Sequence, residues 1–304
     1  MRASGPAVAV IAALMASPMV PTTTVGTPVV PPASCRPAPP DPGPPAAALA
    51  ACAGPAPATT ASARPLAAAS GQPHAPDDFV VLSDVDSRIL TDIRYATAHN
   101  FVGRPIAGYA EPLCLLTRAA ADALRRVQTA ALAQGRSLKV YDCYRPQRAV
   151  DDFVRWAKQP GEEQTKAEFY PRVKKSALFD EGYVGAPTAH SSGSTFDLTL
   201  VAVPPAAQPA YTPGQPLVAC TEPAGRRFAD NSIDMGTGFD CFDPSSATDS
   251  PRVGDAARSN RALLRQLMTE AGFTNYPTEW WHYRLSAEPY PKRYFDFPVA
   301  RSSI

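Results

Sequence analysis

The sequence lacks an excess of charge of either sign. Its 304 residues contain 29 Lys and Arg against 28 Asp and Glu, which leaves a formal net charge of +1. A protein that binds a polyanion uses a surplus of basic residues, and this chain has none to offer. Nucleic acid is therefore not an expected partner.

The first 76 residues almost lack charged side chains. They contain only four Asp, Glu, Lys or Arg residues but 17 of the 35 prolines. A segment with so few large apolar groups cannot offset the entropy cost of ordering its backbone. We expect residues 1–20 to be a secretion signal, residues 21–76 to be a disordered Pro/Ala-rich tether, and residues 77–304 to be the folded domain.

Long apolar runs are also missing. The apolar run of residues 7–15 follows Arg2, has the length of a secretory signal and is too short for a stable membrane span. We therefore expect a secreted or periplasmic protein. The alternative is a lipid anchor at Cys52, because Leu49-Ala-Ala-Cys52 resembles a lipoprotein signal, although the Pro-rich residues before it form a poor apolar segment.

From residue 77 onward the sequence has the patterning of a folded domain. Apolar runs predict strands at residues 79–82, 89–95, 139–143, 196–203 and 280–285. Amphipathic periodicity predicts helices at residues 117–134, 148–158, 165–178 and 259–271. Thr117 is a candidate N-cap, and Gly135 follows the first of these helices. This mixed order predicts a single α+β domain with a central antiparallel sheet flanked by helices.

Residues 204–232 interrupt this pattern. They are rich in proline and show no regular periodicity, so we expect an irregular insertion within the domain. An insertion of this length near a functional site forms either a lid or a surface ornament. The sequence leaves both alternatives open.

Histidine is scarce, which narrows the search for a metal site. Of the four histidines, His190 lies seven residues before Asp197, and His282 lies three residues after Glu279. Two imidazoles and a carboxylate suit zinc, and a catalytic zinc ion keeps three protein ligands and one open position. Glu279 would then be free to carry protons. On the pattern alone, a structural or exposed His/Asp pair is the more common situation.

The spacing of Glu279 and His282 sets a condition on the backbone. Residues three apart lie on the same side of a helix but on opposite faces of a regular strand. If both side chains reach one metal ion, the chain must be distorted between them. Trp280 and Trp281 are expected to be packing groups that hold this distortion.

The strings around these residues resemble the D-alanyl-D-alanine dipeptidases of the VanX type, in zinc peptidase family M15. Residues 188–197 are similar to the family's S-x-H-x-x-G-x-A-x-D string, with Thr188 and Thr195 as departures, and residues 279–283 are similar to its Glu-x-x-His string. Further similar strings follow in chain order at residues 92–97, 100–105, 142–146, 233–236, 288–291 and 294–298. The resemblance runs from about residue 78 to the end and implies a hedgehog-like fold.

This resemblance implies roles for individual residues. His190, Asp197 and His282 would hold one Zn²⁺ per chain. Glu279 would be the general base that takes a proton from the attacking water, and Arg145 would stabilise the developing oxyanion.

The resemblance also implies a small D-amino-acid dipeptide, such as D-Ala-D-Ala, as the substrate. A free amino terminus needs a carboxylate partner, and Asp234 is our candidate for it. Export keeps a second function open, a D,D- or L,D-carboxypeptidase that acts on cell-wall peptides. An alternative of another class is a zinc-binding module without activity, but such a module has no need of an unligated Glu279.

The six cysteines favour disulfides, because an exported protein meets an oxidising environment. No C-x-x-C string occurs, which argues against a structural zinc site built from cysteine. Two cysteines lie in the tether, at residues 35 and 52. The sequence does not determine how the other four are connected. We predict that neighbours along the chain are joined, in the pairs Cys114–Cys143 and Cys220–Cys241.

Overall fold

The structure is a computed structural model that describes residues 73–304. The expected secretion signal, nearly all of the expected tether, Cys35 and Cys52 lie outside the described residues. Within residues 73–304, no helix combines the length and the apolar character needed to cross a membrane.

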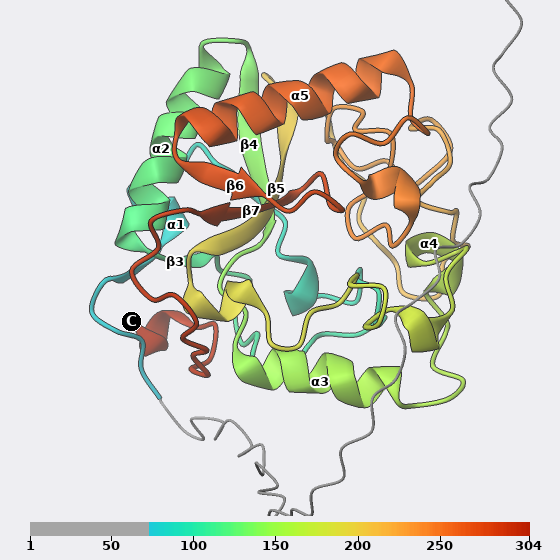
Figure 1. The fold of residues 1–304 in the computed structure, drawn as a ribbon, viewed down its shortest axis with the longest axis horizontal. Coiled ribbons are helices and arrows are strands. Elements are labelled where there is room, and N and C mark those ends of the chain that lie inside the picture. The colour runs from blue at the N-terminus through green and yellow to red at the C-terminus, as the bar shows by residue number, and fades with distance from the viewer. Residues whose placement is uncertain (1–72) are drawn as a thin grey trace, which may run out of the picture. The chain divides into compact units, whose positions relative to one another are not determined.

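A five-stranded sheet lies at the centre of the domain (Figure 1). Its strand order is β2 (Leu90–Thr91), β4 (Arg136–Asp142), β5 (Thr195–Ala202), β7 (His282–Leu285) and β6 (Phe273–Asn275). The β2–β4 pair is parallel, and the other pairs are antiparallel. A second, two-stranded sheet pairs β1 (Phe79–Val81) with β3 (Leu115–Thr117).

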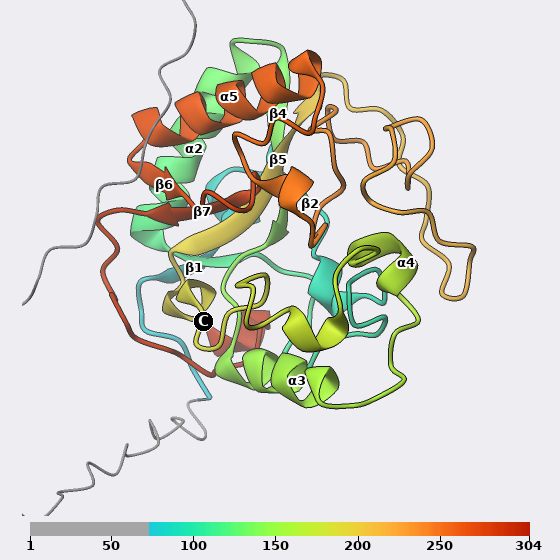
Figure 2. The same ribbon diagram turned by 45° about the vertical axis from the view of Figure 1, so that its right-hand side comes forward.

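Long helices pack against one face of the central sheet, as Figures 1 and 2 show. The long helices α2 (Arg118–Leu132) and α5 (Asp255–Glu270) lie together on one side. Helix α3 (Gln147–Ala157) and the short α4 (Lys166–Phe169) lie on the other side. The remaining helical turns are α1 (Leu82–Val85) and the 3-10 helices η1 (Arg94–Ala96), η2 (Lys175–Ala177), η3 (Ala189–Ser192), η4 (Pro244–Ser246) and η5 (Arg301–Ser303). The predicted α+β class is confirmed.

Helix α2 forms where the sequence pattern predicted it. The Thr117 hydroxyl accepts a hydrogen bond from the Ala120 amide and so caps the first turn. Ala120, Leu124 and Val127 recur at helical spacing and are buried, so this face packs on the core.

Two predicted elements differ most in extent from the structure. The helix predicted at residues 165–178 is broken into α4 and η2, because Pro171 cannot continue a helix and Phe169 and Tyr170 turn into the core. The strand predicted at residues 89–95 is limited to β2, after which the chain turns into η1. Burial of the side chains, rather than local propensity, decides the course of the backbone in both places.

Both disulfides join cysteines that are neighbours along the chain. Cys114 is bonded to Cys143 just beyond the end of β4, and Cys220 is bonded to Cys241. The insertion has no helix or strand between residues 203 and 231, all of which the structure describes. It is therefore irregular, as expected, but it is attached covalently at residue 220.

Candidate active site

Three adjacent strands place acidic and imidazole side chains in one row. In the register of the sheet, Asp142 on β4 is paired with Asp197 on β5, and Asp197 is paired with His282 on β7. Residues paired in this way project from the same face of a sheet. The sheet register therefore brings together residues that are far apart in the sequence.

His190 reaches this row from η3, directly before β5. The Thr188 hydroxyl accepts a hydrogen bond from the His190 amide and caps this short helix. On the imidazole ring, Nδ1 lies 2.8 Å from the carbonyl oxygen of Cys143. A hydrogen bond donated by Nδ1 leaves Nε2 as the free nitrogen, which lies 3.4 Å from Asp197. The backbone carbonyl thus selects the ring nitrogen that can bind a metal.

Gly193 is required by the bend that follows His190. Its φ of 80° is in the left-handed region, and a Cβ atom here would lie 2.2 Å from the ring of Phe79. A larger residue would push η3 away from β5 and separate His190 from Asp197. The glycine in this string is therefore a geometric requirement of the site.

His190, Asp197 and His282 form a cluster that fits a metal ion. One ligand atom from each residue lies within 4.8 Å of the others. Asp197 Oδ1 lies 3.2 Å from His282 Nδ1, yet this buried oxygen has no hydrogen-bond partner among the residues that the structure describes. An unsatisfied buried carboxylate oxygen between two imidazole nitrogens is a favourable site for a cation, and this donor set suits zinc.

The chain is distorted just before β7, as the spacing of Glu279 and His282 required. The Glu279 amide donates to the Tyr276 carbonyl, and the His282 amide donates to the Glu279 carbonyl. These two turns let both side chains face the same side, with Glu279 Oε2 3.5 Å from His282 Nδ1. The Trp280 indole donates to the Thr237 hydroxyl and holds the turns in place.

The charges of the cluster act on one another. Burial raises the pKa of the Glu279 carboxyl well above its usual range, and the negative charges of Asp197 and Asp240 raise it further. Burial also disfavours the ionised form of Asp197, but the His190 and His282 imidazoles outweigh it and lower the pKa of that carboxyl. The two carboxyl groups therefore differ in chemistry, since Asp197 stays ionised and Glu279 readily holds a proton.

Arg145 lies three residues beyond β4 and points back into the site. Its Nε donates to Asp142 over 2.9 Å, and its Nη2 lies 3.5 Å from Asp197 Oδ2. The guanidinium carbon lies 5.0 Å from the centre of the Tyr95 ring. Burial disfavours the charge on Arg145, but Tyr95 and the two carboxylates outweigh it and raise the pKa. A permanent positive charge is thus held beside the cluster.

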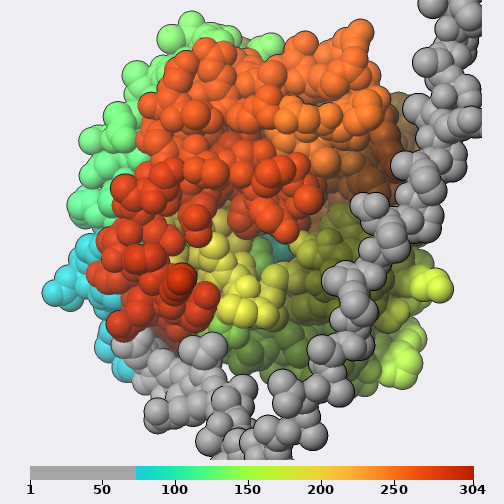
Figure 3. All heavy atoms as spheres, viewed as in Figure 1, coloured from blue at the N-terminus to red at the C-terminus, as the bar shows by residue number. Residues whose placement is uncertain are grey.

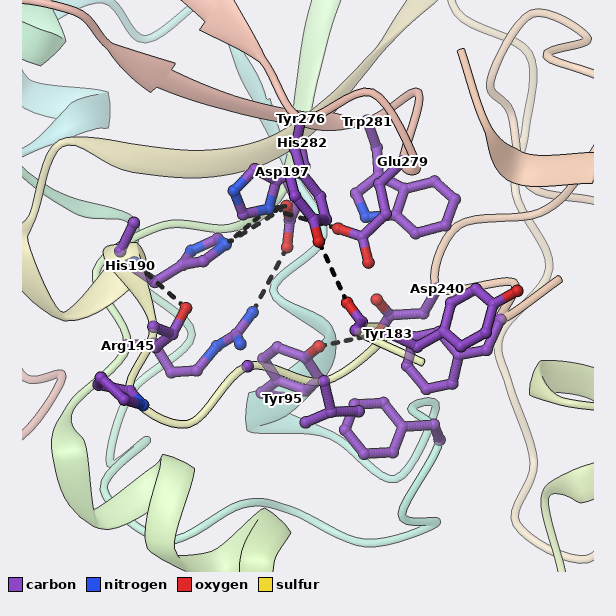
Figure 4. Close-up of a pocket in the computed structure, with 18 residues that line it drawn as sticks. Tyr95, Arg145, Tyr183, His190, Asp197, Asp240, Tyr276, Glu279, Trp281 and His282 are labelled. Atoms are coloured by element: carbon purple, nitrogen blue, oxygen red, sulfur yellow. Dashed lines mark hydrogen bonds and ion pairs between the residues drawn. The ribbon is translucent and has the colours of Figure 1, made fainter. Parts of the chain in front are cut away.

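A cavity of ≈ 250 Å³ opens onto the cluster, at a hollow in the surface seen in Figure 3. Its wall includes Arg145, Glu279, Asp240, Tyr95 and Tyr276. Figure 4 shows Glu279 and Asp240 facing the same space from different segments, with the Tyr95 hydroxyl pointing at Asp240. Tyr95 donates a hydrogen bond to Asp240 Oδ2 over 2.9 Å.

Asp234, the predicted partner of the substrate ammonium group, does not line this cavity. Its side chain is 48% exposed and is paired with Arg227 over 2.7 Å. Asp240, six residues later in the chain, is a carboxylate that does line the cavity. The sequence analysis did not single out Asp240. The feature that could have indicated its burial is the neighbouring Cys241, which was predicted to form a disulfide with Cys220.

An α+β domain in which two imidazoles and two carboxyl groups meet at the mouth of a small cavity has the features of the metallopeptidase class. The sequence model of one family, described as D-ala-D-ala dipeptidase, matches residues 76–204 and 223–300. The chain belongs to this family, peptidase family M15. Residues 205–222 fall outside the match.

Curated relatives agree with the family match. The chain is 42% identical over 223 residues to a D-alanyl-D-alanine dipeptidase of Streptomyces coelicolor, an alignment that covers 73% of this chain and 98% of the relative. It is 37% identical over 222 residues to the enzyme of the same name from Enterococcus faecalis, with the same coverage. The enzyme of that name from Escherichia coli is 32% identical over 218 residues, which are 70% of this chain and 88% of the relative.

Proposed function

We propose that this protein is a zinc-dependent dipeptidase that hydrolyses D-Ala-D-Ala or a similarly small dipeptide. The observation that carries the proposal is the placement of Glu279 and Asp240 in one cavity of ≈ 250 Å³. A catalytic carboxylate and a second carboxylate for the substrate ammonium group, held so close together, suit a very short peptide. The names of the relatives support the same substrate.

His190, Asp197 and His282 would hold the metal. A zinc ion bound there would lower the pKa of a water molecule to about 7 and polarise the scissile carbonyl. Glu279 would accept a proton from the attacking water as the water oxygen bonds to the carbonyl carbon, and would then donate this proton to the amine nitrogen as the C–N bond breaks. Burial and the neighbouring carboxylates raise the pKa of Glu279, and the positive charge of a bound zinc ion would lower this pKa and favour the carboxylate that accepts the proton.

Arg145 would donate to the oxygen of the scissile carbonyl as negative charge develops on it. Its guanidinium is fixed by Asp142, so little reorganisation is needed during the reaction. At the other end of the cavity, Asp240 would bind the substrate ammonium group, with Tyr95 orienting the carboxylate. Burial, followed by the charge of Asp197, raises the pKa of Asp240 to about 8, and a bound ammonium would lower it again.

The proposal is tested by incubating the zinc-loaded protein with free D-Ala-D-Ala and, separately, with a stem pentapeptide that ends in D-Ala-D-Ala. We expect D-alanine to be released from the dipeptide, and the release to stop when a chelator removes the metal. Release from the pentapeptide alone would instead identify a cell-wall carboxypeptidase. A metal-loaded protein that hydrolyses neither would be a binding module.

We further propose that the protein is exported, with residues 1–20 as its signal and residues 21–76 as a tether. The apolar run after Arg2 supports this location, as do the two disulfide pairs, which form and persist in oxidising compartments. Mass spectrometry of protein taken from its native compartment, without reduction, tests it. Four free thiols at residues 114, 143, 220 and 241 would refute export, and a lipid on Cys52 would show an anchored form.

A further inference from the structure

Three residues of the segment outside the family match, residues 205–222, attach it to parts of the domain next to the catalytic cavity. The three contacts are made by Gln208, Tyr211 and Cys220. None of these residues lines the catalytic cavity, so the segment is not a lid over it. Each of the three contacts instead leads to a residue next to the cavity wall.

Gln208 is hydrogen-bonded to two charged residues, Lys139 and Asp92, close to η1. Its carboxamide oxygen accepts from Lys139 Nζ over 2.9 Å, and its nitrogen donates to Asp92 Oδ2 over 3.0 Å. The same Asp92 oxygen accepts from Arg94 Nε over 2.9 Å. Arg94 is 3% exposed and directly precedes Tyr95, so Gln208 helps to fix the backbone that carries this cavity residue.

Tyr211 reaches Arg94 by a second route. Its ring stacks on the His99 imidazole, with 4.1 Å between the ring centres and 6° between the planes. His99 Nδ1 lies 3.0 Å from Arg94 Nη1, and His99 Nε2 lies 2.8 Å from Glu168. Tyr211 therefore covers a buried imidazole that is itself a partner of Arg94.

Cys220 holds the opposite side of the cavity wall. It is bonded to Cys241, and its backbone is hydrogen-bonded to the Glu168 carbonyl and the Gly238 amide. Asp240 lies between Gly238 and Cys241, both of which are attached to Cys220. Its φ is 52°, a conformation that residues other than glycine seldom adopt. Such a conformation persists when the surrounding structure holds it, and here the disulfide is the adjacent covalent constraint.

The three contacts converge on one hydrogen bond, from Tyr95 to Asp240. We infer that residues 205–222 act as a brace that positions the Tyr95–Asp240 pair to receive the substrate ammonium group. This inference rests on the function proposed above. Gln208, Tyr211 and Cys220 are positioning residues, because they act through Tyr95 and Asp240 and do not touch the substrate.

Two variants of the full-length, zinc-loaded protein test the brace. Tyr211→Ala removes the stacked ring, with Tyr211→Phe as the matched control that keeps it. The double variant C220A/C241A removes the covalent attachment. The measured quantities are kcat and KM for D-Ala-D-Ala, and the inhibition constant of propionyl-D-alanine, which is the same molecule without the amino group.

We expect Tyr211→Ala and C220A/C241A each to raise KM by roughly three- to tenfold, the effect of loosening one charge-assisted hydrogen bond. The inhibition constant of propionyl-D-alanine should stay within about twofold, because this compound has no group for Asp240 to bind. Tyr211→Phe should behave as the wild type. A segment with no positioning role would leave KM unchanged, and a general disturbance of the fold would raise both constants together; either result overturns the inference.

Hydrogen exchange of the same variants supplies a readout that does not depend on activity. The brace predicts faster exchange of backbone amides at residues 93–97 and 237–242. Faster exchange confined to residues 205–222 would overturn it. If the wild-type protein does not hydrolyse D-Ala-D-Ala, the proposed substrate is wrong, and the exchange rates alone decide whether the segment holds the cavity wall.

Discussion

At the scale of single residues, the surroundings of the Glu279 carboxyl group suit it to proton transfer. Its carboxylate is buried beside His282, but it is the fourth acidic or imidazole group at a cluster that needs three ligands. Burial raises the pKa of this carboxyl group, and the negative charges of Asp197 and Asp240 raise it further. These properties fit a proton carrier rather than a ligand.

Replacing Glu279 with Gln keeps the shape of the side chain and removes its ability to carry a proton. We expect kcat to fall by roughly 10²- to 10⁴-fold, the usual contribution of a general base or acid. The zinc content should stay near one ion per chain, because the three proposed ligands are intact. Metal analysis and kcat are measured on the same preparation, and loss of the zinc would show that Glu279 is a ligand.

Asp240 and Asp234 offer a matched pair of substitutions in one short segment. Asp240→Asn removes the carboxyl group that would ionise against the substrate ammonium group, so KM for D-Ala-D-Ala should rise about tenfold or more, as expected for a lost charge-assisted hydrogen bond. Asp234→Asn alters an exposed pair with Arg227 and should leave KM at the wild-type value. The reverse order of effects would restore Asp234 as the ammonium partner.

At the scale of elements, the two disulfides close loops of similar length but attach to different sides of the site. The Cys114–Cys143 pair spans 29 residues and lies beside His190, whose Nδ1 is directed at the Cys143 carbonyl. The Cys220–Cys241 pair spans 21 residues and lies beside Asp240. The first therefore supports a proposed metal ligand, and the second supports the proposed ammonium site.

Removing either pair by double substitution to Ala should lower the free energy of unfolding by about 3 kcal/mol, the chain-entropy value for loops of this size. C114A/C143A should in addition weaken zinc binding by about tenfold, because the carbonyl that orients His190 loses its support. C220A/C241A should leave zinc affinity unchanged and so serves as the control. Denaturant titration and zinc titration measure the two effects, and equal zinc affinities in the two variants would contradict this division.

At the scale of the whole molecule, stability depends on charges buried away from the catalytic cavity. His99 is buried between Arg94 and Glu168. Burial, followed by the charge of Arg94, lowers its pKa below the usual 6.5, while Glu168 opposes the shift. The folded protein thus prefers the neutral imidazole.

The sign of the resulting pH dependence follows from this lowered pKa. The stability contribution of His99 is fully present above the unfolded pKa of 6.5 and is lost as the pH falls through the folded pKa. We expect the free energy of unfolding to fall between about pH 7 and about pH 5.5, and His99→Gln to show a smaller fall under the same zinc concentration. Denaturant titrations at both pH values provide the measurement. Equal slopes in the two proteins would exclude His99 as the source.

Much of this protein is determined by local sequence. The spacing of apolar residues and the Thr117 cap were enough to predict α2, and the resemblance of the strings around residues 190 and 279 to those of a known family named the side chains that the structure clusters. These features depend on short-range geometry, such as the period of a helix or the bend that Gly193 allows. They can therefore be recognised without knowing what lies across the fold.

Only the tertiary structure placed Asp240, rather than the predicted Asp234, in the wall of the cavity, and only the tertiary structure showed that residues 205–222 do not line that cavity. Both carboxylates follow β5 in one irregular segment, and which of them faces the cavity depends on Cys220, Glu168 and Tyr95, which come from distant parts of the chain. The break in the helix predicted at residues 165–178 has the same origin, since burial of Phe169 and Tyr170 overrides local propensity. Contacts between segments far apart in the sequence determine which carboxylate faces the cavity and where the predicted helix breaks. Such contacts cannot be read from a local sequence pattern.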